Sequence, residues 1–261
     1  MNNKLRISSY QMDVVWENRQ LNLDKVEKAA KELKGKTDIL VLPEMFSTGF
    51  SMSPEKLAED NKGETISRLE KLARECDVAF VGSFIASGNG HFYNRGFFIT
   101  PVSSEFGDKR HLFRMGEESR HYSAGDKRLI VNYKGFNIAL FICYDLRFPV
   151  WSSNYMNAYD LAVYVASWPK PRIGAWSVLL EARAIENSCY VCGVNRCGVD
   201  GLGLIYSGGS KVVSPKGEIL SQTQESVEEI TTIELDKAWL EDYRRKFPVW
   251  KDSDNFMLLA D

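Results

Sequence analysis

The sequence predicts an α/β protein built as a sandwich of strands and helices. It opens with a strand-like segment at 5–12, a helical pattern at 21–33 and a second strand at 39–42, which is the order of an α/β unit. The run at 39–42 is continuously apolar, as a central parallel strand is. No stretch rich in Pro, Gly and Ser interrupts the 261 residues, so we expect a single domain over residues 1–261.

The rest of the chain continues the alternation of strands and helices. Helices are expected at 65–75, after 149, at 176–186 and after 235. Strands are expected at 78–82, within 92–106, and at 128–133, 136–142, 161–165 and 190–194, with turns at 88–90 and 215–218. Residues 114–127 are polar and charged, and we interpret them as a long surface loop of the kind that is often functional.

Bulk composition is that of an ordinary globular chain. Hydrophobic residues make up 44% and charged residues 26%, which allows a sizeable core. The formal net charge is −2 and the chain has no basic run, so we expect no nucleic-acid partner. No apolar stretch is long enough for a signal peptide or a membrane span, and we therefore predict a cytoplasmic protein with no membrane partner.

The cysteine pattern argues against a disulfide framework and against a metal site. The chain has five cysteines, an odd number. Cys189 and Cys192 match the Cys-x-x-Cys spacing of zinc and redox sites, but they lie in an apolar strand-like run, where residues three apart point to opposite faces. No second such pair follows and the chain has three histidines, so a zinc or dithiol site is disfavoured.

One cysteine, Cys143, stands where the apolar run 139–142 stops. In an α/β sheet, ligand sites collect at the carboxyl ends of strands. Pro149 suits the first turn of a following helix, and such a corner would aim N–H groups at the sulfur and favour a thiolate. A single cysteine is more often a small buried hydrophobe, so the prediction of a nucleophile depends on its neighbours.

Two further residues, Glu44 and Lys109, also stand where a strand-like run stops. Glu44 follows Val-Leu-Pro at a semi-buried position, which makes a carboxylate a better proton acceptor. Either residue alone is more often a surface charge. Together with Cys143 they supply a nucleophile, a base and a fixed cation for an oxyanion, which is the set that acyl transfer requires.

Four segments carrying these residues resemble the successive signature segments of the nitrilase superfamily of carbon-nitrogen hydrolases. They are Leu-Pro-Glu-Met-Phe at 42–46, Lys-Arg-His-Leu-Phe at 109–113, Cys-Tyr-Asp-Leu-Arg-Phe-Pro at 143–149 and Val-Asn-Arg at 194–196. The likeness runs from about residue 5 to about residue 235, with the segments in the family's order. It implies a four-layer α-β-β-α sandwich and a homodimer or a higher even-numbered homo-oligomer.

The resemblance also implies a Glu-Lys-Cys triad at Glu44, Lys109 and Cys143. The family's second glutamate matches Glu118, because the Glu-Ser pair at 118–119 and Ala-Gly-Asp at 124–126 align, and Glu117 stays an alternative. No metal or organic cofactor is implied.

The chemistry that follows is amide hydrolysis through a thioester. Glu44 takes the proton of Cys143, and the thiolate attacks the amide carbonyl of a small-molecule substrate. Lys109 and the backbone N–H of Tyr144 hold the oxyanion. Ammonia leaves, and water activated by the same carboxylate hydrolyses the thioester. Glu118 would position Lys109 or the substrate amide.

Within the superfamily, the chain looks most like the omega-amidase branch, on the segment Ala-Ser-Trp-Pro at 166–169, Arg172, Trp176 and the segment 201–209. That branch cleaves the terminal amide of 2-oxoglutaramate and 2-oxosuccinamate. Because such substrates carry a carboxylate, we expect an arginine fork with Arg172 as the candidate, the alternative being a helix-start arginine that faces water. The aromatic residues expected to wall the pocket are Phe50, Trp168 and Tyr206.

Other functions stay open at this point. An N-carbamoyl amine hydrolase or an aliphatic nitrilase would use the same fold and thiol, and a non-catalytic scaffold would use the fold alone. A Cys-His hydrolase would need His111 or His121, and the sequence implies no partner for either of them.

Overall fold

Two six-stranded sheets form the centre of the protein, whose computed structural model describes residues 3–254 and 256. The first sheet has the order β14-β1-β2-β3-β4-β5 and contains β1 (Lys4–Gln11), β2 (Ile39–Val41), β3 (Ala79–Gly88), β4 (His91–Ile99), β5 (Ser104–Asp108) and β14 (Glu229–Asp236). The second has the order β13-β12-β9-β8-β7-β6 and contains β6 (Leu129–Tyr133), β7 (Phe136–Ile142), β8 (Leu161–Ala166), β9 (Tyr190–Asn195), β12 (Lys211–Val213) and β13 (Ile219–Gln222). A separate pair is formed by β10 (Cys197–Val199) and β11 (Ile205–Ser207).

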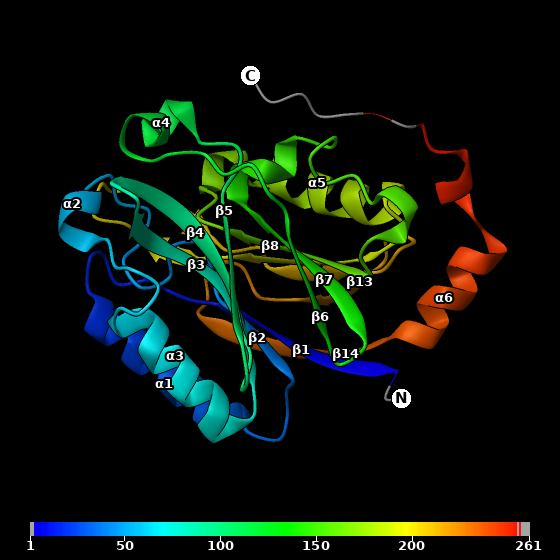
Figure 1. The fold of residues 1–261 in the computed structure, drawn as a ribbon, viewed down its shortest axis with the longest axis horizontal. Helices are drawn as coiled ribbons and strands as arrows, with labels where there is room; N and C mark the ends of the chain where they lie inside the picture. Colours follow the sequence, from blue (N-terminus) through cyan, green and yellow to red (C-terminus); the bar gives the residue numbers. More distant parts are fainter. Residues whose placement is uncertain (1–2, 255, 257–261) are drawn as a thin grey trace.

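Helices cover the outer faces of both sheets, which gives the expected four layers (Figure 1). The first sheet is covered by α1 (Arg19–Leu33) and α3 (Glu64–Cys76), and the second by α5 (Ile173–Glu186). The remaining helices are α2 (Pro54–Leu57), α4 (Glu118–His121) and α6 (Lys237–Lys246), and 3-10 turns occur at Arg114–Gly116, Cys143–Arg147, Tyr155–Asn157, Lys170–Arg172 and Val249–Asp252. The predicted α-β-β-α sandwich is therefore confirmed.

Side chains of β2 point alternately into two apolar clusters, one on each face of the first sheet. Ile39 and Val41 lie in the apolar cluster between the two sheets, whereas Leu40 and Leu42 lie in the cluster beneath α1 and α3. A strand buried on both faces has to be apolar throughout, which is why this segment has no polar position. The division of the chain into domains stays a prediction, and residues 1–2, 255 and 257–261 of the proposed domain lie outside the described residues.

An ion-pair cluster links the two sheets on the side opposite the carboxyl ends of the parallel strands. Asp38 accepts hydrogen bonds from Arg6 of β1 at 3.0 Å and from Lys134, in the turn between β6 and β7, at 2.6 Å. Burial opposes ionisation of this carboxyl, but the hydrogen bonds from Arg6 and Lys134 outweigh it and lower the pKa of Asp38 to about 2.

Two local predictions were wrong in part. No helix begins at Pro149: the chain instead makes a single 3-10 turn over Cys143–Arg147, which ends before the proline because the residue preceding a proline avoids helical geometry. The segment 114–127 is not wholly a surface loop, since it contains the short helix α4, whose first residue is buried. No helix of the described residues is long and apolar enough to span a membrane.

The parallel strands of both sheets deliver three segments to one region. β1, β2 and β3 are parallel neighbours in the first sheet, and β7, β8 and β9 are parallel neighbours in the second. Glu44 follows β2, Cys143 follows β7 and Ser167 follows β8. Carboxyl ends of parallel strands are where α/β folds place their ligand sites.

Candidate active site

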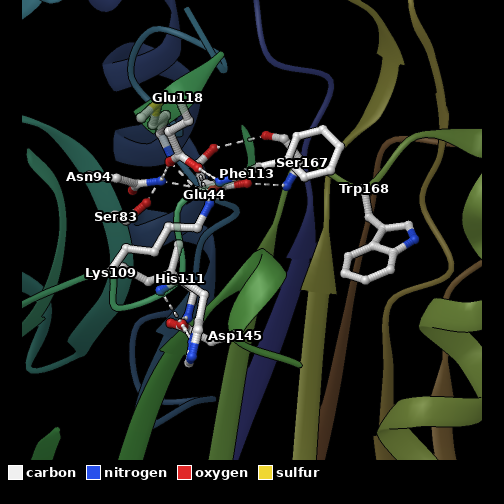
Figure 2. Close-up of polar contacts among 12 residues, drawn as sticks. Glu44, Ser83, Asn94, Lys109, His111, Phe113, Glu118, Asp145, Ser167 and Trp168 are labelled. Carbon is white, nitrogen blue, oxygen red and sulfur yellow. Dashed lines mark hydrogen bonds and ion pairs between the residues drawn. The ribbon is translucent and has the colours of Figure 1, made fainter. Parts of the chain in front are cut away.

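Three charged side chains, Glu44, Lys109 and Glu118, are packed against one another with 0% of each side chain exposed. Lys109 Nζ donates to Glu44 Oε1 at 2.8 Å and to the two oxygens of Glu118 at 3.0 and 2.9 Å (Figure 2). They come from three segments, after β2, after β5 and at the start of α4. The structure thus brings together the base, the cation and the second carboxylate that the sequence predicts.

An amide and two backbone N–H groups complete the surroundings of the carboxylates. Asn94 Nδ2 donates to Glu44 Oε1 at 2.8 Å and to Glu118 Oε1 at 2.9 Å. The Ser167 N–H donates to Glu44 Oε2 at 2.8 Å, and the Phe113 N–H donates to Glu118 Oε2 at 2.6 Å. Figure 2 shows these donors converging on the two carboxylates from different strands and loops.

The charges in this cluster fix the state of the lysine. Burial alone would lower the pKa of Lys109, but the charges of Glu118 and Glu44 outweigh it and raise that pKa above its ordinary value. Burial and the charge of Glu44 raise the pKa of Glu118, against the opposing effects of Lys109 and of the hydrogen bonds from Asn94 and Phe113. Lys109 is therefore a fixed cation at physiological pH.

Cys143 stands at the turn between β7 and the 3-10 segment, in a left-handed backbone conformation with φ of 48°. Such a conformation costs about 1 kcal/mol for a residue with a side chain and is maintained only where the surroundings impose it. Asp145, two residues along the chain, stabilises this turn, since its Oδ2 accepts the Ile142 N–H at 3.1 Å.

The surroundings of Cys143 oppose ionisation of its thiol, whereas the sequence suggests a corner that favours a thiolate. Burial and then the charge of Glu44 raise the pKa of Cys143 well above its ordinary value, and the charge of Lys109 opposes them. The predicted helix dipole is missing because the turn is too short to supply one. A protonated thiol needs a base at the moment of attack, and Glu44 is the neighbour whose charge acts on it most strongly.

His111 has a partner that the sequence did not imply. Its Nδ1 lies 2.8 Å from Asp145 Oδ1, which also accepts the His111 N–H at 2.9 Å. The imidazole stacks on Phe148 with ring centroids 3.7 Å apart. The pair therefore ties the Lys109 segment to the Cys143 turn.

A cavity of about 110 Å³ opens beside Cys143. The three aromatic residues expected to wall the pocket, Phe50, Trp168 and Tyr206, line it, and so do Arg172, the candidate for binding the substrate carboxylate, and Tyr144. Tyr144 is the second residue of the 3-10 turn, where a backbone N–H has no partner inside the turn.

Two guanidinium groups face this cavity. Arg172 lies over the Phe113 ring at 5.2 Å and Arg147 over the Trp168 ring at 5.0 Å. Neither forms an ion pair with a carboxylate of the described residues. Asp200, the acid that lines the cavity, accepts a hydrogen bond from Tyr206 Oη at 2.9 Å.

Burial distinguishes the two candidates for the second glutamate. Glu118 lies in the charged cluster, whereas the Glu117 side chain is 57% exposed and pairs with Arg120 at 2.5 Å. The sequence reasoning missed Asn94, Asp145 and Arg147 as parts of the site. The sequence offers one signal for Asn94. It is a polar amide on the same face of its strand as Gly96 and Phe98, which are not polar, and a polar residue on such a face needs a buried partner.

The Cys-x-x-Cys pair found in the sequence lies in the core. Cys189 and Cys192 are buried free thiols, and Cys192 Sγ lies 3.4 Å from Ser9 Oγ. Over residues 3–254 and 256, no group of three or more His, Cys, Asp or Glu side chains is arranged to hold a metal ion.

The fold and the buried Glu-Lys-Glu cluster beside a cysteine are those of a hydrolase of carbon-nitrogen bonds. The model of the carbon-nitrogen hydrolase family matches residues 6–245, and the chain belongs to this family. It is an amidohydrolase of the nitrilase superfamily, acting on amides other than peptide bonds.

Similar proteins match nearly the whole chain. It is 43% identical over 257 residues to the omega-amidase YafV of Escherichia coli K12, covering 97% of this chain and 98% of that protein. It is 30% identical over 254 residues to the 2-oxoglutaramate amidase of Bacillus subtilis 168, covering 95% and 97%. A crystal structure of a carbon-nitrogen hydrolase superfamily protein from Xanthomonas campestris, with an arsenic adduct in its active site, superposes with a TM-score of 0.95 at 39% identity, covering 98% and 99%.

Proposed function

We propose that the protein hydrolyses the terminal amide of a small 2-oxo dicarboxylate monoamide, such as 2-oxoglutaramate or 2-oxosuccinamate, to the acid and ammonia. The observation that supports this most is that Cys143 and two guanidinium groups without carboxylate partners line one cavity of about 110 Å³. A thiol and two cations on the wall of one cavity suit a substrate that carries both an amide and a carboxylate. The names of the relatives support the same substrate class.

In the proposed reaction, Glu44 is the base, Cys143 the nucleophile and Lys109 the cation. Cys143 Sγ attacks the amide carbon while its proton passes to Glu44. Lys109 and the Tyr144 N–H stabilise the oxyanion that forms. Because two of the Lys109 contacts go to the two oxygens of Glu118, one N–H group can serve both and another can turn to the oxyanion.

The tetrahedral intermediate then collapses in the usual way for acyl transfer. The carbon-nitrogen bond breaks as Glu44 returns its proton to the amide nitrogen, so that ammonia leaves and a thioester remains on Cys143. Water loses a proton to Glu44 and attacks the thioester, which releases the acid and restores the thiol. Glu118 keeps its contacts with Lys109 throughout.

We infer that both Arg147 and Arg172 bind the 2-oxo acid end of the substrate. The two guanidinium groups lie over the Trp168 and Phe113 rings, and a guanidinium so placed can donate N–H groups to a carboxylate. A homodimer and a cytoplasmic location stay predictions.

The test is ammonia release by the purified protein from a panel of amides. The proposal predicts turnover of 2-oxoglutaramate and 2-oxosuccinamate well above that of the same amides without the 2-oxo group. Cys143→Ala should abolish release, while Cys76→Ala, which removes a buried thiol from α3, should keep it. Carbon dioxide release from an N-carbamoyl amine or consumption of a nitrile, with no turnover of the ω-amides, would replace the proposed substrate class.

A further inference from the structure

Asn94 contacts each charged residue of the buried cluster. It lies on β4 with 0% of its surface exposed, and its Nδ2 group donates one hydrogen bond to Glu44 and one to Glu118. The backbone carbonyl oxygen of Asn94 accepts a hydrogen bond from the backbone N–H of Lys109 at 2.9 Å. Its side-chain oxygen Oδ1 is buried and has no hydrogen-bond partner among the described residues.

The unpaired oxygen indicates how strongly the amide is oriented. Turning the amide over would satisfy nothing, because Oδ1 would then face two carboxylate oxygens. A buried acceptor without a partner is costly, so the two N–H donations must outweigh that loss. An amide is also the group that donates two hydrogen bonds without changing the charge of a cluster that already holds two carboxylates and one ammonium.

A count of lone pairs separates the two carboxylates. Each carboxylate oxygen accepts about two hydrogen bonds. Glu118 has both oxygens filled, Oε1 by Lys109 and Asn94, and Oε2 by Lys109 and Phe113. Glu44 has Oε1 filled by Lys109 and Asn94, whereas Oε2 receives the Ser167 N–H alone.

We propose that Asn94 is a positioning residue that selects the proton-accepting atom of the site: by filling Glu44 Oε1 and Glu118 Oε1, it leaves Glu44 Oε2 as the acceptor for the Cys143 proton. This inference rests on the proposed function and deepens it. In the step concerned, the S–H bond of Cys143 breaks, an O–H bond forms at Glu44 Oε2, and the sulfur electron pair forms the bond to the amide carbon. The same proton later leaves with ammonia.

The titratable groups around the two carboxylates are few. Lys109 comes from the end of β5 and Cys143 from the turn after β7. Two tyrosines lie near them, Tyr122 at the end of α4 and Tyr206 on β11, and burial raises the pKa of both above the physiological range. The charge of Glu55 also acts on the pKa of Tyr122, and the charges of Asp200 and Arg196 act on the pKa of Tyr206. The His111–Asp145 pair also lies beside the Cys143 turn. Because every variant keeps that pair, a difference in the acid limb between a variant and the wild type reports the effect of Asn94 on the carboxylate cluster and its thiol.

The test compares Asn94→Ala and the isosteric Asn94→Asp with the wild type. Removing the amide takes a donor from ionised carboxylates, so the cluster binds its proton at higher pH and the acid limb of kcat moves up by about one pH unit. The shift is larger in Asn94→Asp, which adds a third acid. We expect kcat at neutral pH to fall by at least about tenfold, and KM to stay within about twofold because Asn94 does not touch the substrate.

A second readout needs no substrate: the pH dependence of Cys143 alkylation by iodoacetamide, which should move in the same direction. Asn154→Ala is the matched control, since Asn154 is a buried amide whose side chain bonds Tyr159 and Asn187 away from the site. It should lower stability without moving either profile. Near-ultraviolet circular dichroism checks that each variant is folded.

The inference is overturned if folded Asn94→Ala and Asn94→Asp keep the wild-type acid limb, or if KM changes in place of kcat. It is also overturned if Asn154→Ala moves the limb equally, because the effect would then be structural. Failure of the proposed function gives a different result: no ω-amide turnover by the wild type, with the alkylation profiles still differing between the wild type and the Asn94 variants.

Discussion

Replacing Glu44 by glutamine changes one atom of the buried cluster and removes its base. The carboxylate accepts from Lys109 and Asn94 on Oε1 and from the Ser167 N–H on Oε2. A glutamine that keeps its oxygen toward Lys109 and Asn94 must turn its NH₂ group toward the Ser167 N–H. That N–H group is then buried opposite another donor.

The structure sets the size of both effects. Lys109 keeps Glu118 as its counter-ion, so the stability loss is confined to one unmade hydrogen bond, about 1 to 3 kcal/mol. For a chain of this length that lowers the melting temperature by about 3 to 10 °C. Turnover loses the whole contribution of the base, so kcat/KM should fall by about 10² to 10⁴.

The assay is ammonia release from 2-oxoglutaramate, with thermal unfolding measured on the same samples. Glu59→Gln is the matched control, because Glu59 has 9% of its side chain exposed, accepts a hydrogen bond from Thr65 and forms an ion pair with Arg19 outside the cavity. It should lose stability and keep kcat/KM. The reasoning is refuted if Glu44→Gln retains more than about a tenth of wild-type kcat/KM, since a general base contributes more than that.

Three further predictions test the pocket, the lysine and the link between the sheets. Replacing Arg147 or Arg172 by methionine should raise KM for 2-oxoglutaramate about 10- to 100-fold, the value of a hydrogen bond to a charged group, and leave KM for an uncharged amide unchanged; equal changes for both substrates in steady-state assays would exclude carboxylate binding. A Cβ on Gly125 would lie 2.3 Å from a backbone oxygen of β5, next to the buried lysine. Gly125→Ala should therefore lower both kcat and the free energy of unfolding, the latter by about 1 to 3 kcal/mol. The control Gly174→Ala, with no atom within 4 Å of its Cβ, should lower neither. A fully active Gly125→Ala would contradict the argument. Because the folded-state pKa of Asp38 is lowered to about 2, its stabilisation is present above about pH 4 and is lost as the pH falls toward 2. Asp38→Asn should thus be less stable than the wild type at neutral pH, with the two denaturation midpoints converging in acid, and a constant difference would be evidence against this linkage.

The residues that could be predicted are those where the chain changes character. Glu44 and Cys143 each follow an apolar run, and a polar residue at the end of a central strand is visible in the sequence without knowing the fold. The same reasoning located α5 and the strands on either side of it. The resemblance to a family then supplied the order of the layers, which hydrophobic periodicity cannot give.

What could not be predicted depends on register and on contacts between distant segments. Asn94 is one polar residue within β4, and only the packing of that strand puts its amide between two carboxylates. Asp145 is inconspicuous beside Cys143 until the fold brings His111 to it. The helix expected at Pro149 was wrong because the proline stops the preceding turn at Arg147.

The most direct test of the account is the mass of the enzyme during turnover. A rapid acid quench with 2-oxoglutaramate should trap an acyl group on the peptide that contains Cys143, together with one equivalent of ammonia per labelled chain. The label should be absent from Cys143→Ala and should disappear when substrate is exhausted. Turnover by Cys143→Ala, or an acyl group on any other residue, would contradict the assignment of Cys143 as the nucleophile.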